Sequence, residues 1–273
     1  MPRVLILLPP SEGKAAGGTS RPLDLTALSF PALTPVRTRL VEHLSALARS
    51  EPEALRIALG LSLKQVAEVG NNAALTSSPT LPALARYTGI VYDNLAYDTL
   101  AGAARRRANT SLVVASALFG LLRPTDRVPA YRLSGGTVLP GLGGLPGPGG
   151  LAPLWRTALE TELAATRGLV VDLRSGVYAA LATAPGAVEV RVLRDTSGVR
   201  SVVSHDNKWT KGRLARALCE HGARNLADVA EVGRTVSDAV ELAVGKNGPR
   251  VDLVLYGLAS NRDSLASARA PVG

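Results

Sequence analysis

The sequence of 273 residues is poor in cysteine, in aromatic residues and in long apolar runs. Its single cysteine, Cys219, excludes a disulfide within the chain and a zinc site built from cysteines, and we expect a buried thiol in a helix. No stretch approaches the roughly 20 apolar residues of a membrane span. The apolar run after Met1 is too short for a signal peptide. These absences predict a cytoplasmic protein without a membrane partner.

Histidine is also scarce, with only His43, His205 and His221. They are far apart in the sequence and lack the spacing of metal ligands, so we predict no metal site. The sequence has neither a glycine-rich nucleotide fingerprint nor a Gly-x-Ser-x-Gly nucleophile elbow. We therefore expect no cofactor, and we expect a monomer.

Positive charge is what the sequence has in excess. The formal net charge is +9 and the sequence pI is near 10.2. Such an excess favours polyanionic partners, which include nucleic acid and nucleotides. A codon bias toward arginine explains the same charge without a function, because net charge does not say whether the cations cluster. The hydrophobic fraction of 46% is that of a globular chain.

Short apolar runs alternate irregularly with helical patterns, which predicts a mixed α/β fold rather than a regular doubly wound one. Two runs around Arg194-Asp-Thr-Ser-Gly198 indicate a β-hairpin. A Gly/Pro-rich loop at 139–150 interrupts the pattern. The strands are predicted at 4–8, 89–92, 112–116, 169–173, 188–193, 199–203 and 251–256, and the main helices at 35–49, 151–165 and 208–221.

The segment from Ser116 to Thr137 is a cationic loop on a rigid frame. Pro124 and Pro129 stiffen it, and Gly135-Gly136 free the backbone at its end. Arginine forks suit phosphate or carboxylate oxygens, so the segment predicts an anion site. Pairing of each arginine with a local acid such as Asp126 is the alternative. The predicted anion-binding groups are Arg123, Arg132, Gly136 and Thr137, with Tyr131 beside them and Arg127 solvated.

Two further groups follow predicted strands. Lys14 lies in the small-residue loop after 4–8, beside Ser11, where a lysine suits phosphate binding or an activated amine. An exposed loop lysine is the alternative. Asp172 ends another strand and is followed by Ser175 and Tyr178, and strand ends often line clefts. Asp172 is either a general base or, as we favour, the carboxylate that holds Arg123 or Arg132.

A basic helix is predicted from Lys208 to His221, with Asp206 and Asn207 as possible caps. A helix N-terminus after a polar turn suits phosphate groups, and an indole can stack on an unpaired base. A solvated basic helix is the alternative. The residues predicted to bind nucleic acid are Lys208, Trp209, Lys211, Arg213 and Arg216.

Several motifs along the chain resemble one family. They are Pro10-Ser-Glu-Gly-Lys14, Phe119-Gly-Leu-Leu-Arg-Pro-Thr-Asp126, Pro129-Ala-Tyr-Arg-Leu133, Val171-Asp-Leu-Arg-Ser175 and the basic stretch 204–216. On these the chain resembles the YaaA peroxide-stress family (DUF328/UPF0246), as a divergent, actinobacterial-like member. The resemblance implies a single compact domain over 1–273, with a mixed sheet flanked by helices. It also implies a positively charged cleft, a helix-hairpin-helix-like DNA-binding element and a role in peroxide resistance.

Two functions remain open at this stage. The first is a stress-response protein that binds nucleic acid through the cleft and the basic helix. The second is an enzyme acting on a small anionic substrate, a nucleotide or an amino-acid derivative, in a member recruited to specialised metabolism. Its catalytic residues would be Lys14, Arg123, Tyr131, Arg132 and Asp172. The partner is accordingly DNA or a small phosphate or carboxylate ligand.

Overall fold

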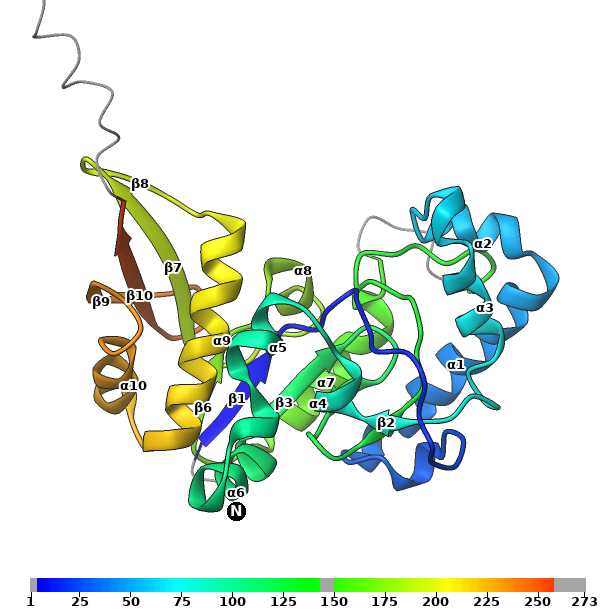
Figure 1. Cartoon of the computed structure of the whole chain (residues 1–273), viewed down its shortest axis with the longest axis horizontal. Helices are drawn as coiled ribbons and strands as arrows, with labels where there is room; N and C mark the ends of the chain where they lie inside the picture. The colour runs from blue at the N-terminus through cyan, green and yellow to red at the C-terminus, as the bar shows by residue number, and fades with distance from the viewer. Residues whose placement is uncertain (1–3, 143–149, 258–273) are drawn as a thin grey trace, which may run out of the picture.

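A mixed β-sheet runs through the molecule, and helices cover both of its faces (Figure 1). The computed structural model describes residues 4–142 and 150–257. The strand order is β4-β3-β1-β6-β7-β10-β9, with β8 paired to β7. The strands of this sheet are β1 (Val4–Leu8), β3 (Leu112–Ser116), β4 (Gly120–Leu122), β6 (Leu169–Asp172), β7 (Val188–Thr196), β8 (Val199–Ser201), β9 (Ala239–Val244) and β10 (Pro249–Tyr256).

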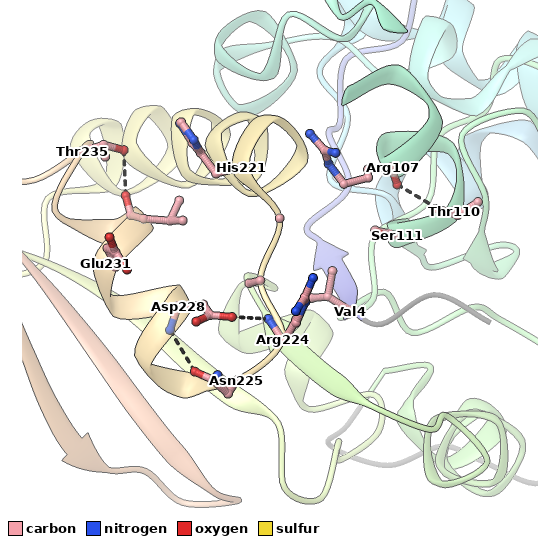
Figure 2. A pocket seen from close by; sticks show the side chains of 13 residues that line it. Val4, Arg107, Thr110, Ser111, His221, Arg224, Asn225, Asp228, Glu231 and Thr235 are labelled. Carbon is pink, nitrogen blue, oxygen red and sulfur yellow. Dashed lines mark hydrogen bonds between the residues drawn. The ribbon is translucent and has the colours of Figure 1, made fainter. Parts of the chain in front are cut away.

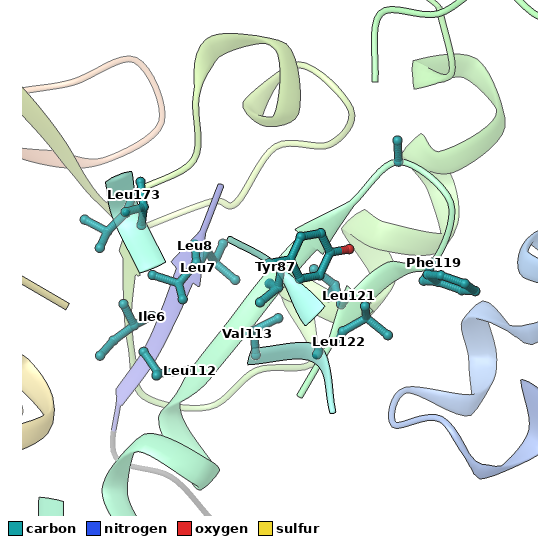
Figure 3. Close-up of a cluster of buried hydrophobic side chains, with 14 of the residues drawn as sticks. Ile6, Leu7, Leu8, Tyr87, Leu112, Val113, Phe119, Leu121, Leu122 and Leu173 are labelled. Atoms are coloured by element: carbon teal, nitrogen blue, oxygen red, sulfur yellow. The ribbon is translucent and has the colours of Figure 1, made fainter. Parts of the chain in front are cut away.

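The centre of the sheet is parallel. β1 lies between β3 and β6, and Ile6 is paired in parallel register with Leu112 on one side and Val171 on the other. Strands buried on both faces are continuous apolar runs, and β1 and β3 are buried at every position. Ile6, Leu7, Leu8 and their neighbours form the core cluster in Figure 3. The predicted strands 4–8, 112–116, 169–173 and 251–256 are confirmed.

The edges of the sheet are antiparallel. The predicted hairpin is confirmed, because β7 and β8 pair with Asp195 opposite Arg200. Its tight turn places Ser197 and Gly198 at φ 53° and 84°, a conformation that glycine adopts at no steric cost. At the two ends of the strand order, β4 pairs antiparallel with β3 and β9 pairs antiparallel with β10. A separate two-stranded sheet joins β2 (Leu81–Pro82) to β5 (Arg127–Val128).

The helices form two groups. α1 to α3 gather at one end of the molecule, whereas α5 and α9 lie side by side next to the centre of the sheet (Figure 1). The helices are α1 (Thr34–Ser50), α2 (Pro52–Ala58), α3 (Ala67–Ala73), α4 (Ala83–Arg86), α5 (Ile90–Leu95), α6 (Gly102–Ser111), α7 (Ala152–Ala164), α8 (Gly176–Ala179), α9 (Ser204–His221) and α10 (Leu226–Gly233).

Two predictions about local structure were wrong. Residues 89–92 are not a strand: α5 begins at Ile90, after Gly89 turns the chain with φ 103°. The basic helix begins at Ser204, four residues before Lys208, so Asp206 and Asn207 are helical and do not cap it. Both differences matter for function, because α5 and the first turns of α9 form walls of the site described below.

The structure tests other sequence predictions only in part. Cys219 is fully buried, as expected, and burial raises the pKa of its thiol to about 12. In the Gly/Pro-rich stretch at 139–150, positions 143–149 lie outside the described residues. A membrane-crossing helix would have to be long and apolar, and none of the described helices is.

Candidate functional site

A cleft of about 520 Å³ opens at the carboxyl ends of β1 and β6. Strands added after β1 lie on both of its sides, β3 on one and β6 on the other, so β1 marks a switch in the winding of the sheet. Ligands of open α/β sheets bind outside the carboxyl ends of strands at such a switch. We call this the carboxyl-edge cleft. Five segments of the chain line this cleft. The lining residues are 9–13, 88–92, Ser134, then Leu173, Ser175, Val177 and Tyr178 after β6, and Ser204, Asn207, Lys208 and Lys211 of α9.

Lys211 brings a buried amine into this cleft. Its side chain is only 7% exposed, and its Nζ donates a hydrogen bond of 3.3 Å to the carbonyl oxygen of Arg174. Burial lowers the pKa of the amine to about 8, although the charges of Asp172 and Glu189 act in the opposite direction. Among the described residues Lys211 forms no ion pair. A buried ammonium without a partner is costly, so an anionic ligand would stabilise it.

Asn207 lies one helical turn before Lys211 and lines the same cleft. Its side-chain oxygen is buried and has no hydrogen-bond partner in the described part of the chain. Unpartnered buried polar atoms are rare in folded proteins, and each calls for an explanation. A ligand group that donates a hydrogen bond would supply the missing partner. The spacing of four residues places both side chains on one helix face.

The loop after β1 holds Lys14 beside the cleft. Its Nζ donates to the carbonyl oxygens of Ser11, at 3.0 Å, and Glu12, at 3.2 Å. The amine also lies 4.1 Å from the centroid of the Tyr131 ring, within cation–π range. Burial, assisted by the charge of Arg132, lowers the pKa of Lys14 to about 7. Lys14 is therefore already well coordinated by the protein, and Ser11 and Glu12, not Lys14, line the cleft.

Tyr131 forms the floor beneath Lys14. It is 1% exposed, and its hydroxyl lies 2.7 Å from those of both Tyr87 and Ser116. Burial raises the pKa of Tyr131 well above its usual value. The neutral, buried Tyr131 ring contacts the Lys14 amine, but Tyr131 does not line the cleft and would not touch a ligand there.

The cationic segment from Ser116 to Thr137 was predicted to form the anion site, but its arginines do not line the cleft. Arg123 donates to the carbonyl oxygen of Thr110 at 2.7 Å and lies over the ring of Phe30. Asp126 accepts from the backbone of Arg123 and Ser29, which holds the turn. A residue of α1 holds the start of the segment in place: the buried guanidinium of Arg37 donates to the carbonyl oxygens of Phe119 and Leu121.

The pairing proposed for Asp172 was wrong. Its carboxylate accepts from the guanidinium of Arg174 at 2.7 to 3.2 Å and also from the Arg174 backbone at 3.0 Å. Arg132 pairs instead with Glu12, at 2.5 Å. Arg174 follows Asp172 by only two residues, so its guanidinium is close enough to pair with the carboxylate. Asp172 therefore does not hold Arg123 or Arg132.

Other predicted anion-binding residues divide into two groups. Ser11, Ser175 and Tyr178 do line the carboxyl-edge cleft. Gly136 and Thr137 do not: Gly136 is exposed, and the buried Thr137 hydroxyl accepts from the backbone of Ser134. Asn207 and Glu12 are cleft residues that were not predicted to bind a ligand. The i,i+4 spacing of Asn207 and Lys211 was the signal that could have revealed Asn207.

The residues predicted to contact nucleic acid point in different directions. Lys208 and Arg213 are exposed, and the Arg213 guanidinium lies 4.5 Å from the Trp209 ring centroid. Lys211 faces the cleft. Arg216 is held by the carbonyl oxygens of Leu95 and Ala96 and by Glu220. Two of the five residues, Lys208 and Arg213, are thus exposed, and Trp209 is half-buried.

A larger cavity, of about 880 Å³, lies at the opposite end of β1 (Figure 2). Arg107 and Arg224 line it, together with Asp228 and Glu231. Arg107 already donates to the carbonyl oxygens of Cys219 and Glu220, and Asp228 accepts from the backbone of Arg224. Arg107 and Asp228 are thus engaged by backbone groups of the protein. Within residues 4–142 and 150–257, no three His, Cys, Asp or Glu side chains are placed to hold a metal.

Comparison with known proteins places the chain in a family. Residues 4–236 match the family model described as peroxide stress protein YaaA. A UPF0246 protein of Corynebacterium efficiens is 47% identical over 89% of this chain and 97% of its own length. A UPF0246 protein of Streptomyces coelicolor is 43% identical over 90% of this chain and 95% of its own length. The resemblance seen in the sequence is confirmed: the chain belongs to the YaaA (UPF0246) family.

Proposed function

We propose that the chain binds a small anionic ligand, with a phosphate or carboxylate group, in the carboxyl-edge cleft. The observation that carries the proposal is the pair Lys211 and Asn207. Among the described residues, the buried amine of Lys211 has no ion-pair partner and the buried amide oxygen of Asn207 has no hydrogen-bond donor. Ser11 and Ser175 add hydroxyl groups to the same cleft, and Lys208 adds an exposed amine at its rim. Together they offer both charge and directed hydrogen bonds to an anion.

Calorimetric titration tests this proposal with three ligands: inorganic phosphate, a nucleoside 5′-phosphate and a 2-oxo acid. We expect at least one of them to bind. Lys211→Met should weaken that binding by roughly ten- to a hundredfold, because a hydrogen bond to a charged group contributes about 1.5 to 3 kcal/mol. Lys64→Met is the matched control, since Lys64 is exposed on a distant short helix. Arg123→Ala should also leave the affinity unchanged. Equal affinities for wild type and Lys211→Met would contradict the proposal.

Nucleic-acid binding is the second candidate, favoured by one surface feature. Trp209 is half-buried under the guanidinium of Arg213, and both lie on the exposed side of α9 near Lys208. Aromatic and arginine planes of this kind stack on unpaired bases. The net charge of +9 would add a salt-dependent attraction to phosphates. α9 is followed after four residues by α10, and a helix-hairpin-helix role for this pair is part of the same proposal.

Binding to duplex, single-stranded and bubble DNA over a range of salt concentrations tests the second candidate. We expect affinity to fall steeply with salt and Trp209→Ala to weaken single-strand binding roughly tenfold, since stacking contributes about 1 to 3 kcal/mol per base. Lys211→Met should leave DNA binding unchanged, because Lys211 is buried. Weak binding without preference for distorted DNA would exclude this candidate. The role in peroxide stress that the family description suggests fits either ligand, and a deletion strain challenged with hydrogen peroxide tests it.

A further inference from the structure

Lys211 lines two cavities. Besides the carboxyl-edge cleft, a second cavity of about 660 Å³ lies on the other side of α8, and Ser175, Asn207 and Lys211 line both. Lys211 therefore borders open space on two sides, although the residue is almost entirely buried. A ligand in either cavity would lie beside this lysine.

The surroundings of this amine leave it free to react. Asp172, the nearest strand-end carboxylate, is engaged through both oxygens by Arg174. Glu189 lines the second cavity but forms no ion pair with Lys211 among the described residues. The 3.3 Å contact with the Arg174 carbonyl is at the long end of hydrogen bonds. No strong acceptor in the described protein thus competes for the nitrogen.

Burial also changes the protonation of Lys211. With a pKa of about 8, roughly one amine in ten is neutral at pH 7. An ordinary lysine, with a pKa near 10.5, is neutral in only about three molecules in ten thousand. The neutral amine is the nucleophile, and desolvation is one of the ways in which proteins activate lysine for covalent chemistry.

We propose that Lys211 forms an imine with a ligand that carries both a carbonyl and an anionic group, such as a 2-oxo acid. This inference rests on the proposed function, because the cleft must first bind the anion. The lysine nitrogen bonds to the carbonyl carbon, and the carbonyl oxygen leaves as water with the two amine protons, which yields a C=N bond. Asn207, one turn away, accepts a hydrogen bond from the carbinolamine hydroxyl while the water departs.

The other lysines are less suited to this reaction. The chain has only five, at positions 14, 64, 208, 211 and 246. Lys14 has a lowered pKa, but two carbonyl oxygens and the Tyr131 ring already coordinate its amine. Lys64, Lys208 and Lys246 are exposed. Lys211 is thus distinguished by position as well as by burial.

Reductive trapping tests the inference. The full chain is incubated at pH 8 with glyoxylate or pyruvate and sodium cyanoborohydride, and the modified lysine is identified by peptide mass mapping. We expect label mainly on Lys211, at least tenfold above any other lysine and increasing with pH around 8. Excess phosphate should suppress it by competition. Lys64→Met should keep this labelling, whereas Lys211→Arg should lose it while retaining a cation for anion binding.

The outcomes separate the two proposals. Anion binding by calorimetry without trapped label at Lys211 would overturn the imine and leave the proposed function standing. Label spread over the lysines in proportion to their exposure would also overturn it. Absence of both binding and labelling would overturn both proposals together.

Discussion

Lys211→Met is expected to raise the free energy of unfolding by about 2 to 3 kcal/mol at pH 7, and this gain should disappear near pH 10.5. The folded-state pKa of about 8 is below the unfolded value of 10.5. Between these values the unfolded chain binds more protons than the folded one, so the stability of the wild type rises with pH. The penalty is fully present below pH 8. The two pKa values differ by about 2.5, which at about 1.36 kcal/mol for each pKa unit is about 3.4 kcal/mol, an upper bound on the gain.

Urea unfolding of wild type and variant at pH 7 and at pH 10.5 measures this effect. Methionine has nearly the length of lysine and no charge, so it fills the site without leaving a buried ion. Lys64→Met, at an exposed position, should change stability by less than about 0.5 kcal/mol at both pH values. A Lys211→Met variant that is less stable than wild type at pH 7 would mean that the ammonium has a favourable partner in the fold.

A gain in stability combined with a loss of ligand binding would identify Lys211 as a functional residue. Cores retain charged groups at a cost to stability where activity needs them, so stabilising changes at such sites commonly reduce function. A residue kept only for packing would show the opposite pattern, since its replacement would destabilise the fold. The two measurements on one variant therefore distinguish a site from a structural lysine.

The fold was predictable from the sequence where burial is continuous. β1 and β3 are apolar at nearly every position and were recognised, as was the β7–β8 hairpin with its Ser197-Gly198 turn. The segment 89–92 was mistaken for a strand because a short apolar run does not distinguish a buried strand from one face of a helix. Only the packing of this segment against α9 decides between them.

The site was harder to predict because it depends on contacts between distant segments. Ser11, Ser175 and Tyr178 were found because strand ends meet at one edge of a parallel sheet. Arg123 was predicted to bind an anion, because the sequence does not show that its guanidinium donates to the carbonyl oxygen of Thr110. Lys211 was assigned to nucleic acid because its burial depends on other segments of the chain: α9 packs against α5 and β7, and the Lys211 amine donates to the carbonyl oxygen of Arg174.

Gly212→Ala is expected to destabilise the protein by about 2 to 3 kcal/mol, although the same change in a helix interior usually stabilises. Gly212 lies on the face of α9 that packs against α5. A Cβ there would overlap the carbonyl oxygen of Val91 and lie 2.8 Å from the Cβ of Asn94. Since the obstacle is largely backbone, the two helices must move apart. Val91 and Lys211 both line the cleft, so ligand affinity should fall as well.

Gly70→Ala in α3 is the matched comparison, because an added Cβ there has open space and ordinary helical φ. It should stabilise the chain by about 0.5 to 1 kcal/mol, because glycine is less favourable than alanine in a helix interior by about that amount. Chemical unfolding of both variants gives the sign of each effect directly. If Gly212→Ala also stabilises, α9 is not held against α5 by this close approach. The cleft would then have to be positioned by another contact, because the spacing of these two helices sets how near Lys211 comes to the loop after β1.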